Sequence, residues 1–228
     1  TPTFGLFNGG FGFYHGARAA NLFISPASSG NTPRQLQLLH DFKIKSIGCV
    51  VSYMARIMEV AIEKNIELPF LKIGIFGSET FSEPMREKIE KSFNIKSYDI
   101  YGMTETGGVG TTGMDCGARC GIHVWEDQYI TEIVDPDTGE PVPDGTYGNV
   151  VFTALNREAM PVIRFKTGDI SKIVSREKCA CGRTSLRIAR ITGRYDDMMI
   201  IKGVNFFPSQ VEQALLEIPG VLPEYQII

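Results

Sequence analysis

The sequence predicts parallel α/β layers followed by a small β-rich lobe, and three observations support this fold class. Apolar strand-like segments alternate with helix-like segments in the first part of the chain, which is typical of parallel strands joined by helices. After residue 123, short β segments follow one another at close spacing, which indicates an antiparallel sheet or barrel. Of the 228 residues, 43% are hydrophobic, which is enough for a sizeable core.

The first part of the chain predicts an alternation of strands and helices. The glycine- and aromatic-rich segment 4–16 predicts either a buried helix–turn or the wall of an apolar pocket. Thr32 is expected to cap a helix that has Pro33 at its first position. In chain order, we expect a strand at 21–26, a helix at 34–42, a strand at 46–52, a helix at 55–64, a strand at 71–76, a helix from a Ser82 cap to near Asn94, and a strand at 97–100.

The second part predicts shorter elements. We expect a β segment at 124–134, turns at 136–139 and 143–145, and strands at 149–154, 162–165 and 198–201. Ile188 should begin a further element, and Ser209 with Glu212 forms a capping box that opens a helix to about Ile218. Asp169 follows Gly168 at the exit of the strand at 162–165, where its carboxylate could accept both hydroxyls of a ribose or form an Asx-turn.

Charge and cysteine usage narrow the function classes. The net charge is −3 and the charges are interspersed, so nothing favours a nucleic-acid partner. No apolar run approaches about 18 residues, so we expect no membrane span, and no signal-peptide pattern is visible. The five cysteines include two close clusters, which favours metal binding in a reducing, cytoplasmic setting over a disulfide framework.

Two polar turns follow predicted strands, Gly77-Ser78-Glu79 and Tyr101-Gly102-Met103-Thr104-Glu105. Ligands of parallel sheets bind outside the carboxyl ends of the strands, so we expect both turns to meet at one site. In the second turn an aromatic ring can stack on a base, a hydroxyl can bind a phosphate oxygen, and a carboxylate can hold Mg²⁺. The set suits a magnesium nucleotide, and a glycine turn without a ligand is the alternative.

Four dispersed motifs resemble those of the adenylate-forming superfamily and occur in the same order. They are the two turns above, Arg164-Phe165-Lys166-Thr167-Gly168-Asp169, and Gly193-Arg194-Tyr195-Asp196-Asp197-Met198. More narrowly, the stretches 26–32, 125–127 and 205–209 resemble the phenylacetate–CoA ligase family. The resemblance covers essentially the whole chain.

The resemblance implies a role for each matching residue. Tyr101 would stack on adenine, Thr104 would contact phosphate and Glu105 would bind Mg²⁺. Gly77, Ser78, Glu79, Gly102 and Met103 would line the nucleotide pocket, and Asp169 would hold the ribose. Arg194 would reach the ribose or phosphate, Asp196 would be the hinge of a small C-terminal domain, and Gly203 would lie near the pantetheine path of CoA. Phe11, Tyr14 and Gly102 would be candidates for the aryl pocket.

The implied activity converts an aryl carboxylic acid, ATP and CoA to an acyl thioester through an acyl-adenylate. The resemblance implies an incomplete large domain at 1–123, its β-rich lobe at 124–195, and the start of an α+β C-terminal domain at 196–228. The family's phosphate loop and C-terminal lysine have no match in this sequence, so we expect an internal fragment whose adenylation step is severely impaired. A homodimer is what the family suggests, and the sequence does not select one aryl acid.

The cysteines form two clusters, Cys116-x3-Cys120-x2-His123 and Cys179-x-Cys181. Two such turns facing each other could hold zinc tetrahedrally, while the alternative is two unrelated groups of reduced cysteines. The family resemblance favours Cys116, His123, Cys179 and Cys181 as ligands of a structural zinc, with Cys120 outside the set. Cys49 is expected in the core.

The sequence is also compatible with two other classes of protein. One is a zinc-stabilised module that binds a nucleotide or an aryl acid without catalysis, because the sequence has no match to the family's phosphate loop and C-terminal lysine. The other is a zinc-ribbon nucleic-acid binder, which the acidic balance disfavours.

Overall fold

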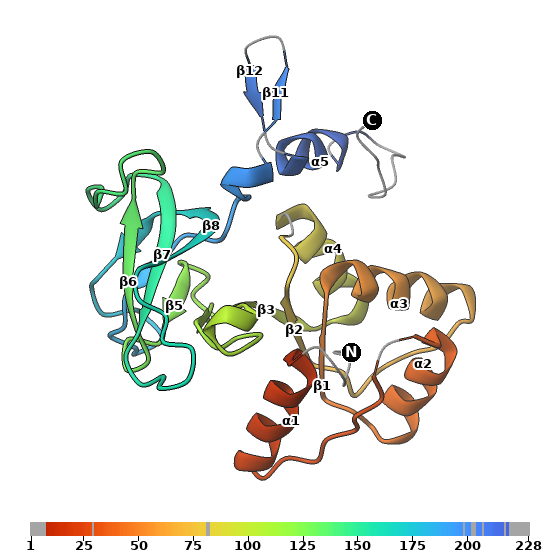
Figure 1. Ribbon diagram of the computed structural model, residues 1–228. Coiled ribbons are helices and arrows are strands. Elements are labelled where there is room, and N and C mark those ends of the chain that lie inside the picture. Colours follow the sequence, from red (N-terminus) through yellow and green to blue (C-terminus); the bar gives the residue numbers. More distant parts are fainter. Residues whose placement is uncertain are drawn as a thin grey trace. The chain divides into compact units, whose positions relative to one another are not determined.

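The computed structural model describes residues 8–28, 30–80, 83–197, 199–201, 204–206, 208–216 and 218. The chain divides into two compact units, Thr1–Gly117 (unit 1) and Ala118–Ile228 (unit 2). Figure 1 labels the elements of both units. No helix within the described ranges is both long and apolar enough to cross a membrane.

Unit 1 contains a parallel α/β arrangement, which confirms the predicted fold class. Its strands are ordered β1-β2-β3-β4. The pairs β1–β2 and β2–β3 are parallel, and β4 runs antiparallel to β3. The bounds are β1 Ser46–Cys49, β2 Ile73–Gly77, β3 Lys96–Tyr101 and β4 Gly113–Met114.

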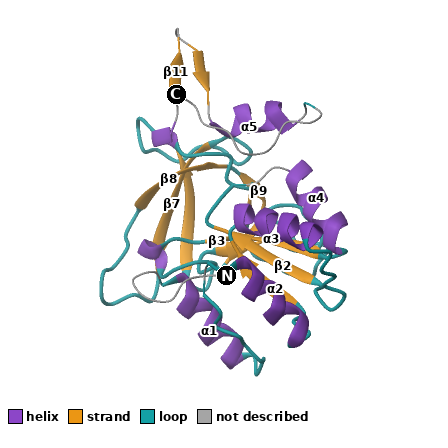
Figure 2. Cartoon of the chain, turned by 90° about the vertical axis from the view of Figure 1, so that its right-hand side faces the viewer, coloured by secondary structure: helices purple, strands orange, loops and turns teal. Residues whose placement is uncertain are grey.

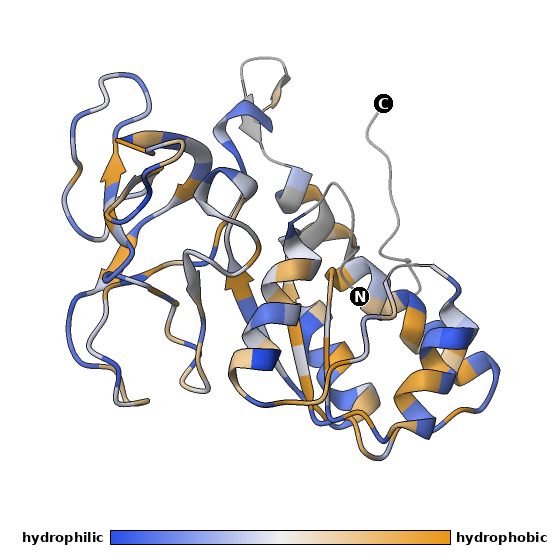
Figure 3. Cartoon of the chain, turned by 60° about the horizontal axis from the view of Figure 1, so that its bottom comes forward, coloured by the Kyte–Doolittle hydropathy of each residue, from blue (hydrophilic) through white to orange (hydrophobic). Residues whose placement is uncertain are grey.

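Helices α3 and α4 alternate with strands β1, β2 and β3 in the sequence, and they lie beside the sheet in Figure 2. Helix α2 packs against α3, and α3 packs against α4. Hydrophobic and hydrophilic segments alternate along these helices in Figure 3, as expected when one face covers a core. Leu36, Met54, Ile57, Phe76 and Ile89 are fully buried in this core. The bounds are α1 Gly9–Ala19, α2 Thr32–Asp41, α3 Val51–Glu63, α4 Glu83–Phe93 and a 3₁₀ turn, η1, at Thr104–Thr106.

A buried ion pair ties α4 to the end of β4. Arg86 Nη2 lies 2.9 Å from Asp115 Oδ2, and the two side chains are 1% and 3% exposed. The second carboxylate oxygen of Asp115 accepts a hydrogen bond of 3.0 Å from the backbone N–H of Asp99 in β3. One carboxylate therefore connects a helix and two strands beside the motif that follows β3.

Unit 2 is rich in antiparallel strands, as predicted. Strands β6, β7 and β8 form an antiparallel sheet, β10 pairs with β5 and β9, and β11 pairs with β12. The bounds are β5 Ile122–Val124, β6 Tyr129–Val134, β7 Gly148–Ala154, β8 Phe165–Ser171, β9 Ile173–Ser175, β10 Arg187–Ile188, a 3₁₀ turn, η2, at Tyr195–Asp197, β11 Met199–Ile201, β12 Val204–Phe206 and α5 Pro208–Leu216.

Several predicted elements of unit 1 are wrong in detail. Residues 21–26 form no strand. The strand predicted at 46–52 ends at Cys49, because Val51 already begins α3. Asn31 rather than Thr32 caps α2: its side chain accepts the N–H of Arg34, and its φ of 48° is the left-handed conformation that asparagine tolerates.

Two predictions in unit 2 also need correction. The β segment predicted at 124–134 is split by a turn, in which Trp125 O accepts the N–H groups of Gln128 and Tyr129. The strand predicted at 162–165 instead begins at Phe165 and continues to Ser171. The predicted cap Ser82 lies outside the described residues, and the predicted domain bounds at 123 and 195 stay predictions.

Candidate active site

A cavity of about 660 Å³ in unit 1 opens where β1, β2 and β3 end. The turns after β2 and β3 both contribute to its wall, as expected from the carboxyl-end rule for parallel strands. Its lining is mostly apolar, with a few polar side chains from the start of α1, from α3 and from the turns. The lining residues are Asn8, Gly9, Gly10, Phe13, Cys49, Val50, Ser52, Tyr53, Arg56, Gly77, Ser78, Ile100, Gly102, Met103, Thr104 and Val109.

Glycines let the two turns approach closely. A Cβ on Gly77 would lie 2.6 Å from Ile100 Cγ1, and a Cβ on Gly102 would lie 2.3 Å from Gly108 O and 2.7 Å from Gly110 N. The contacts of Gly102 are with backbone, which cannot rotate away. The loop after β3 is therefore closed on itself by a position that only glycine can fill.

Hydroxyl groups fix the turn that carries the predicted phosphate and metal residues. Thr112 Oγ1 donates to Tyr101 O at 2.7 Å, and Thr106 Oγ1 donates to Met103 O at 3.1 Å. The turn ends at Gly107, which has a φ of 107°. Thr104 and Glu105 are exposed on η1. The roles of Thr104 at phosphate and of Glu105 at Mg²⁺ stay predictions.

Tyr101 is the last residue of β3 and is only 8% exposed. It is not one of the residues that line the cavity, whereas Gly102, Met103 and Thr104 are. Stacking of its ring on adenine remains a prediction.

Glu79 makes contacts that the sequence did not indicate. Its carboxylate accepts the backbone N–H of Ser52 at 3.0 Å and the Ser52 hydroxyl at 2.8 Å. Ser52 lies in the first turn of α3, where backbone N–H groups lack partners within the helix. Glu79 therefore ties the turn after β2 to the start of α3. It is not among the cavity residues, and its role in an adenine pocket stays a prediction.

Helix α1 directs Phe13, rather than Phe11 or Tyr14, to the cavity. Phe11 is 44% exposed and stacks on His15, and the Tyr14 ring meets His15 edge-on. A Cβ on Gly48 would lie 2.8 Å from Phe13 Cε1, so the absence of a side chain in β1 leaves room for this ring. Of the predicted aryl-pocket residues, Gly102 alone lines this cavity.

Cys49 also lines the cavity, at the end of β1. Burial raises the pKa of its thiol to about 12, so it stays protonated near neutral pH. It is a core residue, as predicted, and part of an apolar wall.

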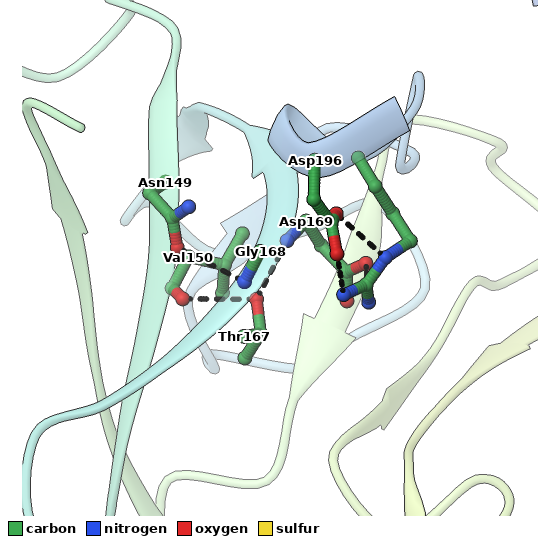
Figure 4. A network of polar contacts seen from close by, with 7 residues as sticks. Asn149, Val150, Thr167, Gly168, Asp169 and Asp196 are labelled. Carbon is green, nitrogen blue, oxygen red and sulfur yellow. Dashed lines mark hydrogen bonds and ion pairs between the residues drawn. The ribbon is translucent and has the colours of Figure 1, made fainter. Parts of the chain in front are cut away.

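In unit 2, Asp169 lies within β8 rather than at a strand exit, which corrects both the predicted location and the Asx-turn alternative. The pairing of β7 and β8 shifts register between Asn149 and Val151, and Gly168 at this bulge has a φ of 83°. A glycine in the left-handed conformation is typical of a bulge. Figure 4 shows the polar contacts around it.

Three hydrogen bonds hold the bulge in place. Thr167 Oγ1 donates to Val150 O at 3.0 Å and accepts the N–H of Asp169 at 3.0 Å, while Gly168 N donates to Asn149 Oδ1 at 3.3 Å (Figure 4). The side chain of Asp169 is 10% exposed. These contacts fix the backbone from which the Asp169 carboxylate projects.

Arg194 is brought to Asp169 by strand-like backbone pairing and then held by two carboxylates. Asp169 and Arg194 form an antiparallel bridge. Arg194 Nη1 donates to Asp169 Oδ1 at 3.2 Å, while Nε and Nη2 donate to Asp196 Oδ1 and Oδ2 at 2.9 and 2.8 Å. The hydrogen bonds with Asp196 raise the pKa of Arg194, and those with Arg194 lower the pKa of Asp196.

The other cations of this motif hold the neighbouring turn. Arg164 Nη2 donates to Gly139 O at 3.0 Å, and Lys166 Nζ donates to Pro136 O at 2.7 Å. In the 3₁₀ turn, Tyr195 Oη donates to Asp137 Oδ1 at 3.2 Å, and this bond raises the pKa of the tyrosine. The turn at 135–139 thus braces both β8 and η2. Gly203 lies outside the described residues.

Three of the four predicted zinc ligands lie together in unit 2. The ligand atoms of His123, Cys179 and Cys181 lie within 4.8 Å of one another, with Cys181 Sγ 3.5 Å from His123 Nε2. His123 Nδ1 is 3.1 Å from Ser185 Oγ, which leaves Nε2 facing the thiols. Cys116, the fourth predicted ligand, is buried near the end of unit 1.

Cys120, predicted to lie outside the ligand set, approaches this group. Its Sγ lies 3.4 Å from Cys179 Sγ and accepts a hydrogen bond of 2.8 Å from Arg187 Nη1.

Sequence reasoning assigned no role to Ser52, Asn149 or Thr167, and it indicated the aromatic-rich segment 4–16 without selecting Phe13. Ser52 and Asn149 act through residues far away in the sequence, so no local pattern marks them. Gly168 inside a β-like stretch was the available sign of a bulge.

The comparisons with known proteins agree on one family. A family model described as AMP-binding enzyme matches residues 4–155, and one described as AMP-binding enzyme C-terminal domain matches residues 203–228. A phenylacetate–coenzyme A ligase of Thermus thermophilus is 43% identical over 99% of this chain and 51% of that protein. One of Escherichia coli is 38% identical over 98% of this chain and 51% of that protein.

Among solved structures, a 2-hydroxyisobutyryl-CoA ligase in the postadenylation state superimposes with a TM-score of 0.89 at 30% identity. The match covers 96% of this chain and 48% of the ligase. This chain spans about half the length of the curated relatives it matches. The order of the motifs, the α/β arrangement of unit 1 and these matches agree, and the chain belongs to the AMP-binding enzyme family.

Proposed function

We propose that this chain is part of an AMP-forming acyl-CoA ligase that activates an aryl carboxylic acid, with phenylacetate as the first acid to test. The observation that carries the proposal is the cavity at the strand ends of unit 1, where the Gly77-Ser78 turn and the Gly102–Thr104 turn meet on a mostly apolar wall. The similarity to phenylacetate–coenzyme A ligases over nearly the whole chain supports the choice of acid.

Each motif region would contribute groups that bind the nucleotide. Thr104 would donate its hydroxyl to a phosphate oxygen, Asp169 would accept the ribose hydroxyls, and Arg194 would pair with the ribose or phosphate side. Tyr101 would stack on adenine, with Glu79 near the base. The exposed position of Thr104 and the fixed backbone of Asp169 support these roles.

The reaction proceeds in two displacements. A carboxylate oxygen of the acid attacks the α-phosphorus of ATP, the bond to pyrophosphate breaks, and an acyl-adenylate forms. The CoA sulfur then attacks the acyl carbon, and the bond to AMP breaks to give the thioester. Both steps bring anions together, so positioning and hydrogen-bond donors supply most of the catalysis.

The chain's own residues contribute in distinct ways. The Thr104 hydroxyl and the Arg194 guanidinium are donors that would face developing negative charge on phosphate oxygens. Phe13 and Cys49 would exclude water from the acyl side of the cavity. Glu105, exposed on η1, would hold Mg²⁺, which neutralises phosphate charge when bound. Asp196 would be the hinge, and Gly203 would lie on the CoA path.

We also propose a structural zinc held by Cys116, His123, Cys179 and Cys181. The grouping of a buried imidazole with two thiols supports it, because these donors suit tetrahedral zinc. Metal analysis of protein purified without chelator should find about one zinc per chain, and chelation should lower its melting temperature. Absence of zinc would remove this part of the proposal.

The activity is tested by pyrophosphate release from ATP in the parent enzyme. Release should depend on phenylacetate and fall at least about tenfold in Asp169→Asn, because a charge-assisted hydrogen bond to the ribose is lost. A matched control is Asp144→Asn, an exposed carboxylate paired with Arg176 on the surface of unit 2, which should leave the rate unchanged. Nucleotide binding without acid-dependent pyrophosphate release would instead indicate a non-catalytic binding module.

A further inference from the structure

The Arg194 guanidinium donates hydrogen bonds to two carboxylates. Its Nε and Nη2 face both oxygens of Asp196 at 2.9 and 2.8 Å, and its Nη1 faces Asp169 at 3.2 Å. Arginine can bind a carboxylate or a phosphate through two parallel hydrogen bonds, and the Nε and Nη2 groups on one edge of the guanidinium form such a pair. Asp196 therefore occupies the edge that a phosphate would use.

The two carboxylates hold Arg194 from different backbones. Asp169 is on β8, and the backbone bridge between Asp169 and Arg194 fixes their distance. Asp196 instead belongs to the 3₁₀ turn at Tyr195–Asp197, which follows Arg194. The side chain of Asp169 is 10% exposed and that of Asp196 is 62% exposed. The ion pair between Arg194 and Asp196 is thus the one that solvent can enter and that a rearrangement of the turn can break.

Because Gly168 has no side chain, the Arg194 guanidinium and the Asp196 carboxylate can lie against β8. A Cβ at Gly168 would lie 2.8 Å from Arg194 Nη2 and 3.3 Å from Asp196 Oδ1. The bulge of β8 therefore lies directly against the ion pair. Arg194 is positioned beside the ribose-binding candidate Asp169 while its charge is neutralised by Asp196.

We propose that Asp196 is a positioning residue that withholds Arg194 from the nucleotide phosphate, so that AMP must displace the Asp196 carboxylate from the guanidinium. The proposal rests on the proposed function, since it takes the nucleotide site as given. The new element is that Asp196, the proposed hinge residue, also controls nucleotide affinity through its side-chain carboxylate. Because an exposed ion pair is weak, the displacement costs little and the contact tunes affinity without abolishing binding.

The test compares AMP and adenosine affinities of the chain by calorimetry. Asp196→Asn should bind AMP about 3- to 10-fold more tightly and leave adenosine unchanged, since adenosine has no phosphate to receive the freed guanidinium. Asp196→Glu, which keeps a carboxylate, should return AMP affinity towards that of the unaltered chain.

Asp197→Asn is the matched control, because it removes the same charge one residue away. Asp197 contributes to the electrostatic environment of Arg194, but the paired hydrogen bonds come from Asp196. This variant should change AMP affinity less than twofold. Equal gains in Asp196→Asn and Asp197→Asn, or equal gains for AMP and adenosine, would overturn the inference.

The outcomes separate this inference from the proposed function. AMP binding that is unchanged in Asp196→Asn defeats only the inference. AMP binding by no variant defeats the nucleotide site and the inference together. Binding by Asp196→Asn where the unaltered chain binds too weakly to measure supports the inference in its strongest form.

Discussion

The end of β3 in unit 1 and the bulge of β8 in unit 2 carry the most specific motifs of the chain, but different forces build them. Beside β3, Arg86 and Asp115 pair at 2.9 Å with both side chains buried, and Gly102 is enclosed by backbone atoms. Beside β8, Arg194 and Asp196 pair at 2.8 Å with side chains that are 44% and 62% exposed.

The two pairs have nearly the same length and should have different consequences. A buried charge that loses its partner cannot be solvated, whereas an exposed charge is solvated at once. The region around β3 should therefore respond to substitution through stability, and the region around β8 through ligand affinity. Four substitutions test how strongly buried, backbone and exposed contacts stabilise the fold, from the largest expected effect to the smallest.

Asp115→Ala should lower the free energy of unfolding by about 3–5 kcal/mol, because it removes the buried carboxylate at 2.9 Å from Arg86 and leaves the longer ion pair of 3.8 Å with the half-exposed Glu83. The N–H of Asp99 also loses its acceptor. Urea denaturation measures the change. Asp144→Ala, which breaks a pair with side chains that are 58% and 50% exposed, should cost less than about 1 kcal/mol. Similar losses of unfolding free energy in Asp115→Ala and Asp144→Ala would contradict the difference expected between a buried and an exposed ion pair.

Gly102→Ala should cost at least about 2 kcal/mol, because its Cβ would overlap three backbone atoms that only a shift of the loop can relieve. The matched control is Gly16→Ala in α1, where a Cβ would meet nothing within 4 Å. That change should be neutral or stabilising by up to about 1 kcal/mol, because alanine favours a helix interior. Thermal and urea unfolding measure both variants, and a harmless Gly102→Ala would contradict the closed-loop geometry.

Gly168→Ala sharpens the comparison between the regions. Its Cβ would meet the end of the flexible Arg194 side chain rather than backbone, so the main cost is the left-handed conformation, about 1–2 kcal/mol. We expect the unfolding free energy to fall less than in Gly102→Ala. A larger loss than in Gly102→Ala would show that the bulge, and not the β3 loop, is the more constrained backbone.

The smallest effect concerns the exposed pair of Asp144 and Arg176. Hydrogen bonding to Arg176 lowers the pKa of Asp144, so the pair stabilises the fold above the unfolded carboxyl pKa. This contribution is lost as pH falls through the lowered folded value. In carboxyl NMR titrations, Arg176→Gln should move the Asp144 pKa back towards about 3.9. An unchanged titration would show that the pair does not form in solution.

The sequence predicted the location of the cavity because the rule used was topological. Glycine turns directly after two strand-like segments must lie at one edge of a parallel sheet, and Gly77 and Gly102 do line the same cavity. The choice of Phe11 and Tyr14 for the aryl pocket stays a prediction, and neither residue lines this cavity. The glycine-rich segment that holds them has no clear amphipathic period. The phase of α1 was therefore not readable, and Phe13 faces the cavity instead.

The position of Asp169 was missed for a related reason. Lys166 to Asp169 reads as a turn because Gly168 is a strong local breaker. The strand continues through it only because Asn149 and Val150 on β7 supply partners for the bulge. Pairing partners far away in sequence are invisible to local patterns, as are contacts such as Glu79 with Ser52.

The most direct test of the central claim is the affinity for AMP measured by calorimetry in Thr104→Val, Asp169→Asn and the double variant. If Thr104 and Asp169 each contact AMP as proposed, each single change should weaken binding at least about fivefold without altering the melting temperature, and the double variant should be weaker still. Unchanged affinity in either single variant would contradict the nucleotide-binding role proposed for that residue.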